Sequence, residues 1–225
     1  MTKAISKPHP NEQLLQAAPL SEAAGSLRSP AAFFIIRAAA ELRALGAPTV
    51  IVIISENDVV IATTVWLARR GIRPIRVCLV TPVTGTRYED KQRLQAALAA
   101  EGIDPSNLHA VTTGPDIIAK SAEEYWQVEC KGVGSGVQST QRNNFDRALA
   151  STVSYFGSAV EIGVECENRQ PVLGLALPKS RDYIAQLRRR VRPSLRRTIN
   201  LWLLLYEPST GKVESVAPDQ SVPGP

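Results

Sequence analysis

Short apolar runs alternate with amphipathic stretches along most of this 225-residue chain. Runs of four to eight apolar or β-branched residues predict strands, and amphipathic stretches closed by glycine predict helices. The expected strands are 49–54, 73–80, 108–112, 117–119, 125–131, 171–177, 201–206 and 211–216. The expected helices are 31–45, 56–70, 88–101, 139–156 and 180–192. This order predicts an α/β fold with a mixed central β-sheet flanked by helices.

Two of these elements carry further local signals. Ser55 precedes the helix 56–70, and Asp58 stands three residues later, which is the spacing of a capping box. The run Leu201–Tyr206 is apolar throughout, which is typical of a strand buried on both faces. We therefore expect this strand at the centre of the sheet.

Composition sets the expected domain organisation and location. Residues 1–29 are rich in proline, serine and alanine and predict a flexible N-terminal segment, 30–218 predict a single α/β domain, and 219–225 predict a flexible tail. The three cysteines are far apart and odd in number, which argues against a disulfide framework and favours a reduced, cytoplasmic protein. The apolar runs are too short to span a bilayer, so no membrane association is expected.

The strand 125–131 places charged side chains on one face. Successive side chains of a strand point to opposite faces, so Trp126, Val128 and Cys130 share the apolar face that belongs to the core. Glu129 and Lys131 then lie together on the other face, which we expect the core not to need. The strand 117–119 precedes this one by a short polar link, so the two predict a hairpin.

The hairpin brings Asp116, at the start of its first strand, toward Glu129 and Lys131. Two carboxylates that meet in this way suit a hard divalent cation, Mg²⁺ with Mn²⁺ as a substitute. Such a cation polarises a phosphoryl oxygen and lowers the pKa of a bound water. A neighbouring lysine stabilises the charge that develops on the phosphorus centre. The three residues therefore predict chemistry suited to phosphodiester hydrolysis.

Pro115-Asp116, the twelve residues 117–128 and then Glu129-Cys130-Lys131 resemble the signature of the PD-(D/E)xK nuclease superfamily. That superfamily includes restriction enzymes, junction resolvases and repair nucleases. The likeness covers roughly residues 55–206, because a helix and a strand precede the aspartate and a helix and a strand follow the lysine. The resemblance implies a restriction endonuclease-like core, catalytic Asp116, Glu129 and Lys131, and a metal held by Asp116 and Glu129.

The same resemblance suggests supporting residues. Many relatives carry a glutamate in the first core helix that supports a metal-bound water, and Glu56 or Asp58 is expected in that role. Acids in a first helical turn also favour the positive end of the helix dipole, whatever their function. Relatives often place a glutamine on the helix after the lysine, and Gln141 is the nearest candidate here. The alternative for Gln141 is an exposed residue at a helix start.

A basic segment predicts contacts with a polyanion. Between Lys179 and Arg197 the chain carries eight lysine or arginine residues and one acid, Asp182. The guanidinium fork matches phosphate oxygens, so Lys179, Arg181, Arg188 and Arg192 are expected to contact a nucleic-acid backbone. The alternative is a solvated helix face.

Together these features predict a magnesium-dependent nuclease, with DNA favoured over RNA and with a homodimer or a partner protein as a further option for targeting. One alternative is a non-catalytic nucleic-acid-binding or scaffold protein with the same fold. Another is an α/β ligand-binding domain in which the motif is accidental. That reading expects a glycine-rich turn after the first strand, and residues 54–57 contain no glycine.

Overall fold

The computed structural model describes residues 54–80, 87–110, 114–133, 138–161 and 169–224. The chain divides into two units, Met1–Pro48 and Thr49–Pro225. The first unit lies wholly outside the described residues. The expected helix 31–45 and all but the last residue of the expected strand 49–54 lie outside them as well.

The second unit contains a mixed seven-stranded sheet with the strand order β2-β1-β3-β4-β5-β6-β7. Its strands are β1 (Arg73–Val77), β2 (His109–Ala110), β3 (Ile117–Lys120), β4 (Glu124–Cys130), β5 (Gln170–Pro178), β6 (Leu201–Glu207) and β7 (Lys212–Val216). β4, β5 and β6 run parallel, so their carboxyl ends lie at one edge of the sheet. The α/β fold class with a mixed sheet is confirmed.

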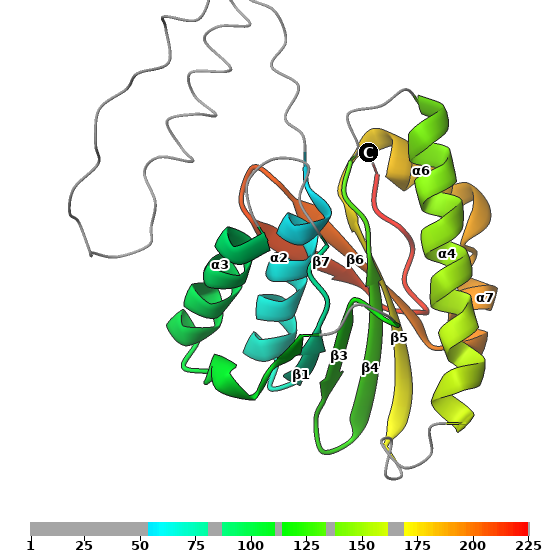
Figure 1. The fold of residues 1–225 in the computed structure, drawn as a ribbon. Coiled ribbons are helices and arrows are strands. Elements are labelled where there is room, and N and C mark those ends of the chain that lie inside the picture. The colour runs from blue at the N-terminus through cyan, green and yellow to red at the C-terminus, as the bar shows by residue number, and fades with distance from the viewer. Residues whose placement is uncertain (1–53, 81–86, 111–113, 134–137, 162–168, 225) are drawn as a thin grey trace, which may run out of the picture. The chain divides into compact units, whose positions relative to one another are not determined.

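Helices cover both faces of this sheet (Figure 1). The helices are α2 (Glu56–Arg69), α3 (Arg87–Ala100), α4 (Gln138–Glu161), α6 (Arg181–Arg190) and α7 (Pro193–Thr198), with a short 3₁₀ turn at Pro105–Asn107. α2 and α3 lie on one face, and α4, α6 and α7 lie on the other. No helix within the described ranges is long and apolar enough to cross a lipid bilayer.

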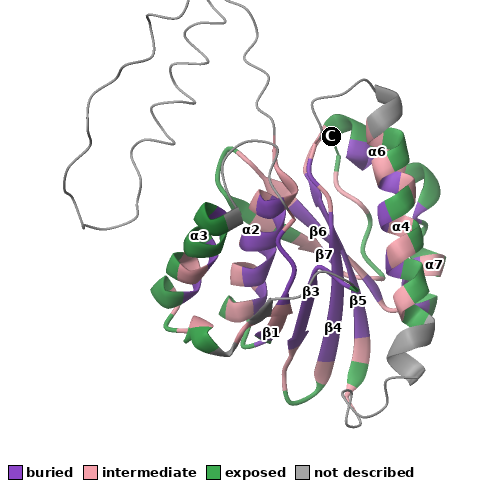
Figure 2. Ribbon diagram, in the orientation of Figure 1, coloured by how far each residue is buried: buried purple, intermediate pink, exposed green. Residues whose placement is uncertain are grey.

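The alternation of side chains along the strands divides the core into two layers. On the α2 face, Trp126, Val128 and Cys130 of β4 pack against Val59 and Leu67 of α2. On the α4 face, leucines of β5 and β6 pack against Phe145 of α4 and Leu187 of α6. Figure 2 shows the strands of the sheet as mostly buried between these helices. The sheet therefore has no open face over β4, β5 and β6.

The local signals for α2 are confirmed. Ser55 is the N-cap, its hydroxyl accepts a hydrogen bond from the Asp58 backbone N–H, and the Asp58 carboxylate accepts one from the Ser55 N–H. The helix stops at Arg69, and Gly71 follows with a φ of 74°, a left-handed conformation that glycine adopts without strain.

Three expectations about the elements are wrong. β6 lies next to the sheet's edge strand β7, and β4 occupies the centre. The apolar sequence of β6 reflects burial by helices on both faces, not a central position in the sheet. β1 ends at Val77 instead of Val80. The expected helix 180–192 ends at Arg190, because Pro193 disfavours a helical Arg192, whose ψ of 152° is extended.

The segment after β7 has contacts that the expectation of a loose tail did not include. The guanidinium of buried Arg196 donates to the carbonyl oxygens of Ala217 and Gln220. Arg188 donates to the carbonyl of Val222 at 3.4 Å. Residues 217–222 are thus tied back to α6 and α7.

Candidate functional site

The β3–β4 hairpin brings Asp116 to Glu129. The strands pair antiparallel with Ile117 opposite Val128, so Asp116 comes next to the Glu129 position. A carboxylate oxygen of Asp116 accepts a hydrogen bond of 2.7 Å from the backbone N–H of Cys130. Both acids are buried, with 7% of Asp116 and 6% of Glu129 exposed. The predicted hairpin and the meeting of these two carboxylates are confirmed.

Lys131 joins the two acids of the motif to a third carboxylate. Its ammonium nitrogen lies 3.3 Å from Oε1 of Glu129 and 3.0 Å from Oε2 of Glu56. Glu56 opens α2, and the side chains of Glu56 and Lys131 are each 20% exposed. We call Glu56, Asp116, Glu129 and Lys131 the candidate site. It lies at the carboxyl end of β4 and opens to solvent on the side of Glu56 and Lys131.

A close backbone contact places α2 at this end of β4. The N–H of Val133 donates to the carbonyl of Ile54 at 2.8 Å. A Cβ added to Gly132 would lie 2.4 Å from the Ile54 oxygen and 2.6 Å from the Glu56 nitrogen, so only glycine fits there. Gly132 also accepts a hydrogen bond from the Tyr183 hydroxyl through its carbonyl, at 2.9 Å. The backbone that leads into α2 therefore packs directly against Gly132.

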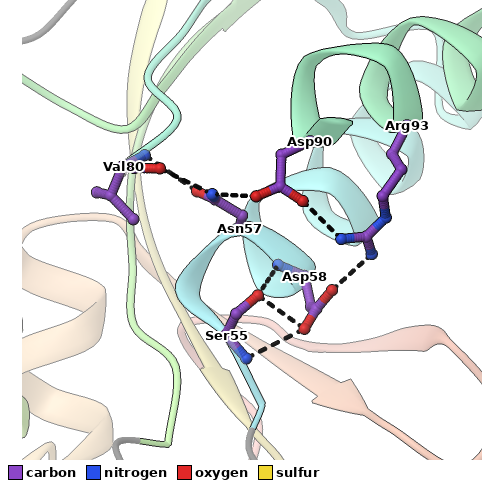
Figure 3. Close-up of polar contacts among 6 residues, drawn as sticks. All are labelled: Ser55, Asn57, Asp58, Val80, Asp90 and Arg93. Atoms are coloured by element: carbon purple, nitrogen blue, oxygen red, sulfur yellow. Dashed lines mark hydrogen bonds and ion pairs between the residues drawn. The ribbon is translucent and has the colours of Figure 1, made fainter. Parts of the chain in front are cut away.

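A buried polar network holds the first turn of α2 against its neighbours (Figure 3). The amide of Asn57 donates to the Val80 carbonyl at 2.9 Å and to Asp90 at 2.7 Å, and it accepts from the Val80 N–H at 3.0 Å. Asn57 is fully buried. Arg93 of α3 bridges Asp90 and Asp58 at 2.7 and 2.6 Å. This network therefore anchors α2 at Asn57, the residue that follows Glu56.

Of the two supporting acids expected on α2, only Glu56 reaches the candidate site. Asp58 is held by the Ser55 cap and by Arg93, and it points toward α3 (Figure 3). The reason is the helical periodicity of about 100° per residue, which turns residues two apart to different sides. The carboxylate of Asp58 therefore serves the helix cap and the α2–α3 contact.

The face of β4 that carries Glu129 is covered by α4, so the expectation that the core does not need this face is wrong. The hydroxyl of Tyr155 on α4 donates to Oε2 of Glu129 at 2.8 Å. Tyr155 was not predicted as a site residue. Helical spacing from the buried Ala148 and Thr152 was a signal that it faces the sheet. Which strand residue it meets depends on how α4 packs.

The electrostatics of the candidate site follow from crowded, desolvated carboxylates. Burial and the nearby charge of Glu129 raise the pKa of Asp116 to about 7. The hydrogen bond from Cys130 and the charge of Lys131 act in the opposite direction and lower this pKa. Burial opposes the charge on Lys131, yet the carboxylates of Glu56, Asp116 and Glu129 raise its pKa above the ordinary value. Lys131 therefore stays protonated at neutral pH, while Asp116 titrates close to it.

The residues present fit a magnesium or manganese ion. Within the described ranges no three histidine, cysteine, aspartate or glutamate side chains are grouped to hold a metal by themselves. Mg²⁺ is commonly bound by one or two carboxylates together with waters and substrate phosphate. Asp116 has one carboxylate oxygen that accepts no hydrogen bond from the described residues. A cation there would also relieve the repulsion that raises the pKa of Asp116.

Gln141 makes no contact with the candidate site among the described residues. It lies in α4 fourteen residues before Tyr155, which is about 21 Å along a helix with a rise of 1.5 Å per residue. Its side-chain oxygen is buried without a hydrogen-bond partner in the described part of the chain. Gln127 shares this property, and it lies on β4 two residues before Glu129. The predicted support from Gln141 is not brought to Lys131.

The four predicted phosphate-contacting residues divide into two pairs. Lys179 forms an ion pair of 2.6 Å with Glu214, and Arg188 donates to Val222. The side chains of Arg181 and Arg192 are exposed and make no hydrogen bond or ion pair within the described residues. Arg181 lies in the first turn of α6, whose Tyr183 contacts Gly132. Of the four, Arg181 and Arg192 are available to an external anion.

In comparisons with known proteins, no family model, no curated protein sequence and no solved structure matches this chain.

Proposed function

We propose that this chain is a metal-dependent nuclease that hydrolyses phosphodiester bonds of nucleic acid, with DNA as the expected substrate. One observation carries the proposal: Asp116, Glu129, Lys131 and Glu56 come together at the carboxyl end of β4 from three separate segments of the chain. Carboxylates that can hold a cation, with a charged lysine beside them, can supply the chemistry of phosphodiester hydrolysis.

The order of elements supports the same proposal. α2 and β1 precede Asp116, the β3–β4 hairpin carries the motif, and α4 and β5 follow Lys131. β1, β3 and β4 pair antiparallel and β4 pairs parallel with β5. The order of these elements around the motif is the order that the resemblance to the PD-(D/E)xK superfamily implies.

Each residue has a role that follows from its position. Asp116 and Glu129 would hold Mg²⁺, which supplies a Lewis acid and lowers the pKa of a bound water. Lys131 presents a fixed positive charge beside them, to stabilise charge that develops on the phosphate. Glu56 holds Lys131 at 3.0 Å and orients its ammonium group. Arg181 binds the nucleic-acid backbone at the start of α6.

The test incubates the full chain with plasmid, linear and single-stranded DNA, with Mg²⁺ and with excess chelator. Cleavage is expected with Mg²⁺ alone. Asp116→Asn and Glu129→Gln should abolish it, and both variants keep an oxygen that can accept the native hydrogen bonds. Glu123→Gln is the matched control, because Glu123 is an exposed acid at the opposite end of the hairpin. Cleavage in excess chelator, or full activity of either site variant, would overturn the proposal.

A second candidate is a non-catalytic nucleic-acid-binding or scaffold protein. The observation that favours it is the ion pairing of Lys131 with Glu56 and Glu129, which leaves the lysine charge neutralised within the fold. This function predicts DNA binding without cleavage at any Mg²⁺ concentration. It also predicts that Asp116→Asn binds DNA as the wild-type protein does.

A further inference from the structure

We infer that Tyr155 is a positioning residue for Glu129, which it holds so that one carboxylate oxygen stays directed to the cation and to Lys131. The inference rests on the proposed function, because it concerns how the proposed metal ligand is oriented. It assigns a role to α4 that the sequence motif does not contain.

The two oxygens of Glu129 have different partners. Oε2 accepts the hydrogen bond of 2.8 Å from the Tyr155 hydroxyl, and Oε1 lies 3.3 Å from the ammonium of Lys131. The carboxylate is therefore held from two sides, by α4 above the sheet and by the end of β4. A free glutamate side chain has several rotatable bonds, and fixing it in advance removes an entropic cost from metal binding.

The environment makes this hydrogen bond persistent. Glu129 is 6% exposed, so water cannot readily replace the tyrosine hydroxyl. A hydroxyl has a single proton, and in this contact the proton points to Glu129.

Partners of this kind tune metal sites. Removing a group that hydrogen-bonds to a metal ligand commonly lowers metal affinity by roughly tenfold to a hundredfold. Tyr155→Phe keeps the ring and removes only the hydroxyl. We expect it to weaken Mn²⁺ binding by at least about tenfold and to raise the Mg²⁺ concentration needed for half-maximal cleavage. Turnover at saturating Mg²⁺ should change much less.

The experiment measures Mn²⁺ binding to the full chain by calorimetry, without nucleic acid, and the urea midpoint of each sample. Tyr206→Phe is the control, because Tyr206 is half-buried and packs in the core layer on the α2 face. Weaker binding by Tyr155→Phe with an unchanged urea midpoint is the expected result. Affinity within twofold of wild type overturns this inference and leaves the proposed function standing. A large loss of folding stability also overturns it, because the hydroxyl then serves the fold. Failure of the wild-type chain to bind Mn²⁺ overturns both.

Discussion

The ammonium group of Lys131 lies 3.0 Å from a carboxylate oxygen of Glu56, although 75 positions separate the two residues in the chain. The pair exists because the backbone at Gly132 and Val133 touches the backbone at Ile54 and Ser55. This backbone contact therefore sets the ion pair between Lys131, at the end of β4, and Glu56, at the start of α2. Substitutions in that contact should change the candidate site without touching its charged groups.

Gly132→Ala tests this dependence. The added methyl would lie 2.4 Å from the Ile54 oxygen and 2.6 Å from the Glu56 nitrogen, so the start of α2 must move. We expect a loss of about 3 kcal/mol in the free energy of unfolding, as in overpacked interiors, together with loss of any metal-dependent activity. Gly71→Ala is the comparison, because its methyl meets open space and only its φ of 74° is unfavourable. It should cost about 1 kcal/mol. Equal urea midpoints for the two variants would contradict the prediction.

The raised pKa of Asp116 predicts a pH dependence of folding in the absence of metal. Its pKa is about 7 in the folded chain, against an ordinary value of 3.8, so the folded state binds this proton more tightly than the unfolded state. The stability that this group contributes is fully present below about pH 4 and is lost as the pH rises through about 7. Each unit of pKa difference corresponds to about 1.4 kcal/mol.

Asp116→Asn removes that titration. Urea unfolding in chelator at several pH values between 4 and 8 should show wild-type stability falling relative to the variant as pH rises. A difference between the two proteins that stays constant, or that grows in favour of the wild type, would contradict the raised pKa of Asp116.

Asn57→Ala tests the network that fixes α2. The substitution removes three hydrogen bonds and leaves the Val80 N–H and carbonyl and one side of Asp90 unpaired in a buried place. We expect a loss of about 3 kcal/mol, because each buried polar group without a partner costs about 1–3 kcal/mol. Asn143→Ala, on the exposed surface of α4, is the control and should be neutral or slightly stabilising. Thermal unfolding of both variants is the measurement.

Arg181 and Arg192 test where nucleic acid binds. Both are exposed and unpaired within the described residues, but Arg181 begins α6, and Arg192 lies eleven positions later, between α6 and α7. Because Arg181 is at the end near Gly132, Arg181→Ala should weaken duplex DNA binding and reduce the slope of log affinity against log salt by about 0.9. Arg192→Ala carries the same change in charge and should leave both unchanged. Equal effects of the two variants would place the nucleic acid along the whole helix.

Much of the candidate site follows from local rules in the sequence. The alternation in β4 assigns Trp126, Val128 and Cys130 to one core layer, and the short link before β4 predicts the hairpin that carries Asp116 to Glu129. The capping box at Ser55 and Asp58 is equally local. These predictions succeed because strand alternation, hairpin closure and helix capping depend on residues close together in the chain.

The remaining features depend on packing between distant segments, which local patterns do not contain. Tertiary structure decides that Glu56 rather than Asp58 faces Lys131, and that α4 covers the Glu129 face and brings Tyr155 to it. It also decides which basic residues make contacts within the chain, as Lys179 and Arg188 do, and which make no hydrogen bond or ion pair with the described residues, as with Arg181 and Arg192. The physical reason is that a side chain's partner across an interface depends on the position and rotation of whole helices. The position and rotation of each helix are set by burial of the apolar surface of the whole domain, not by any single motif.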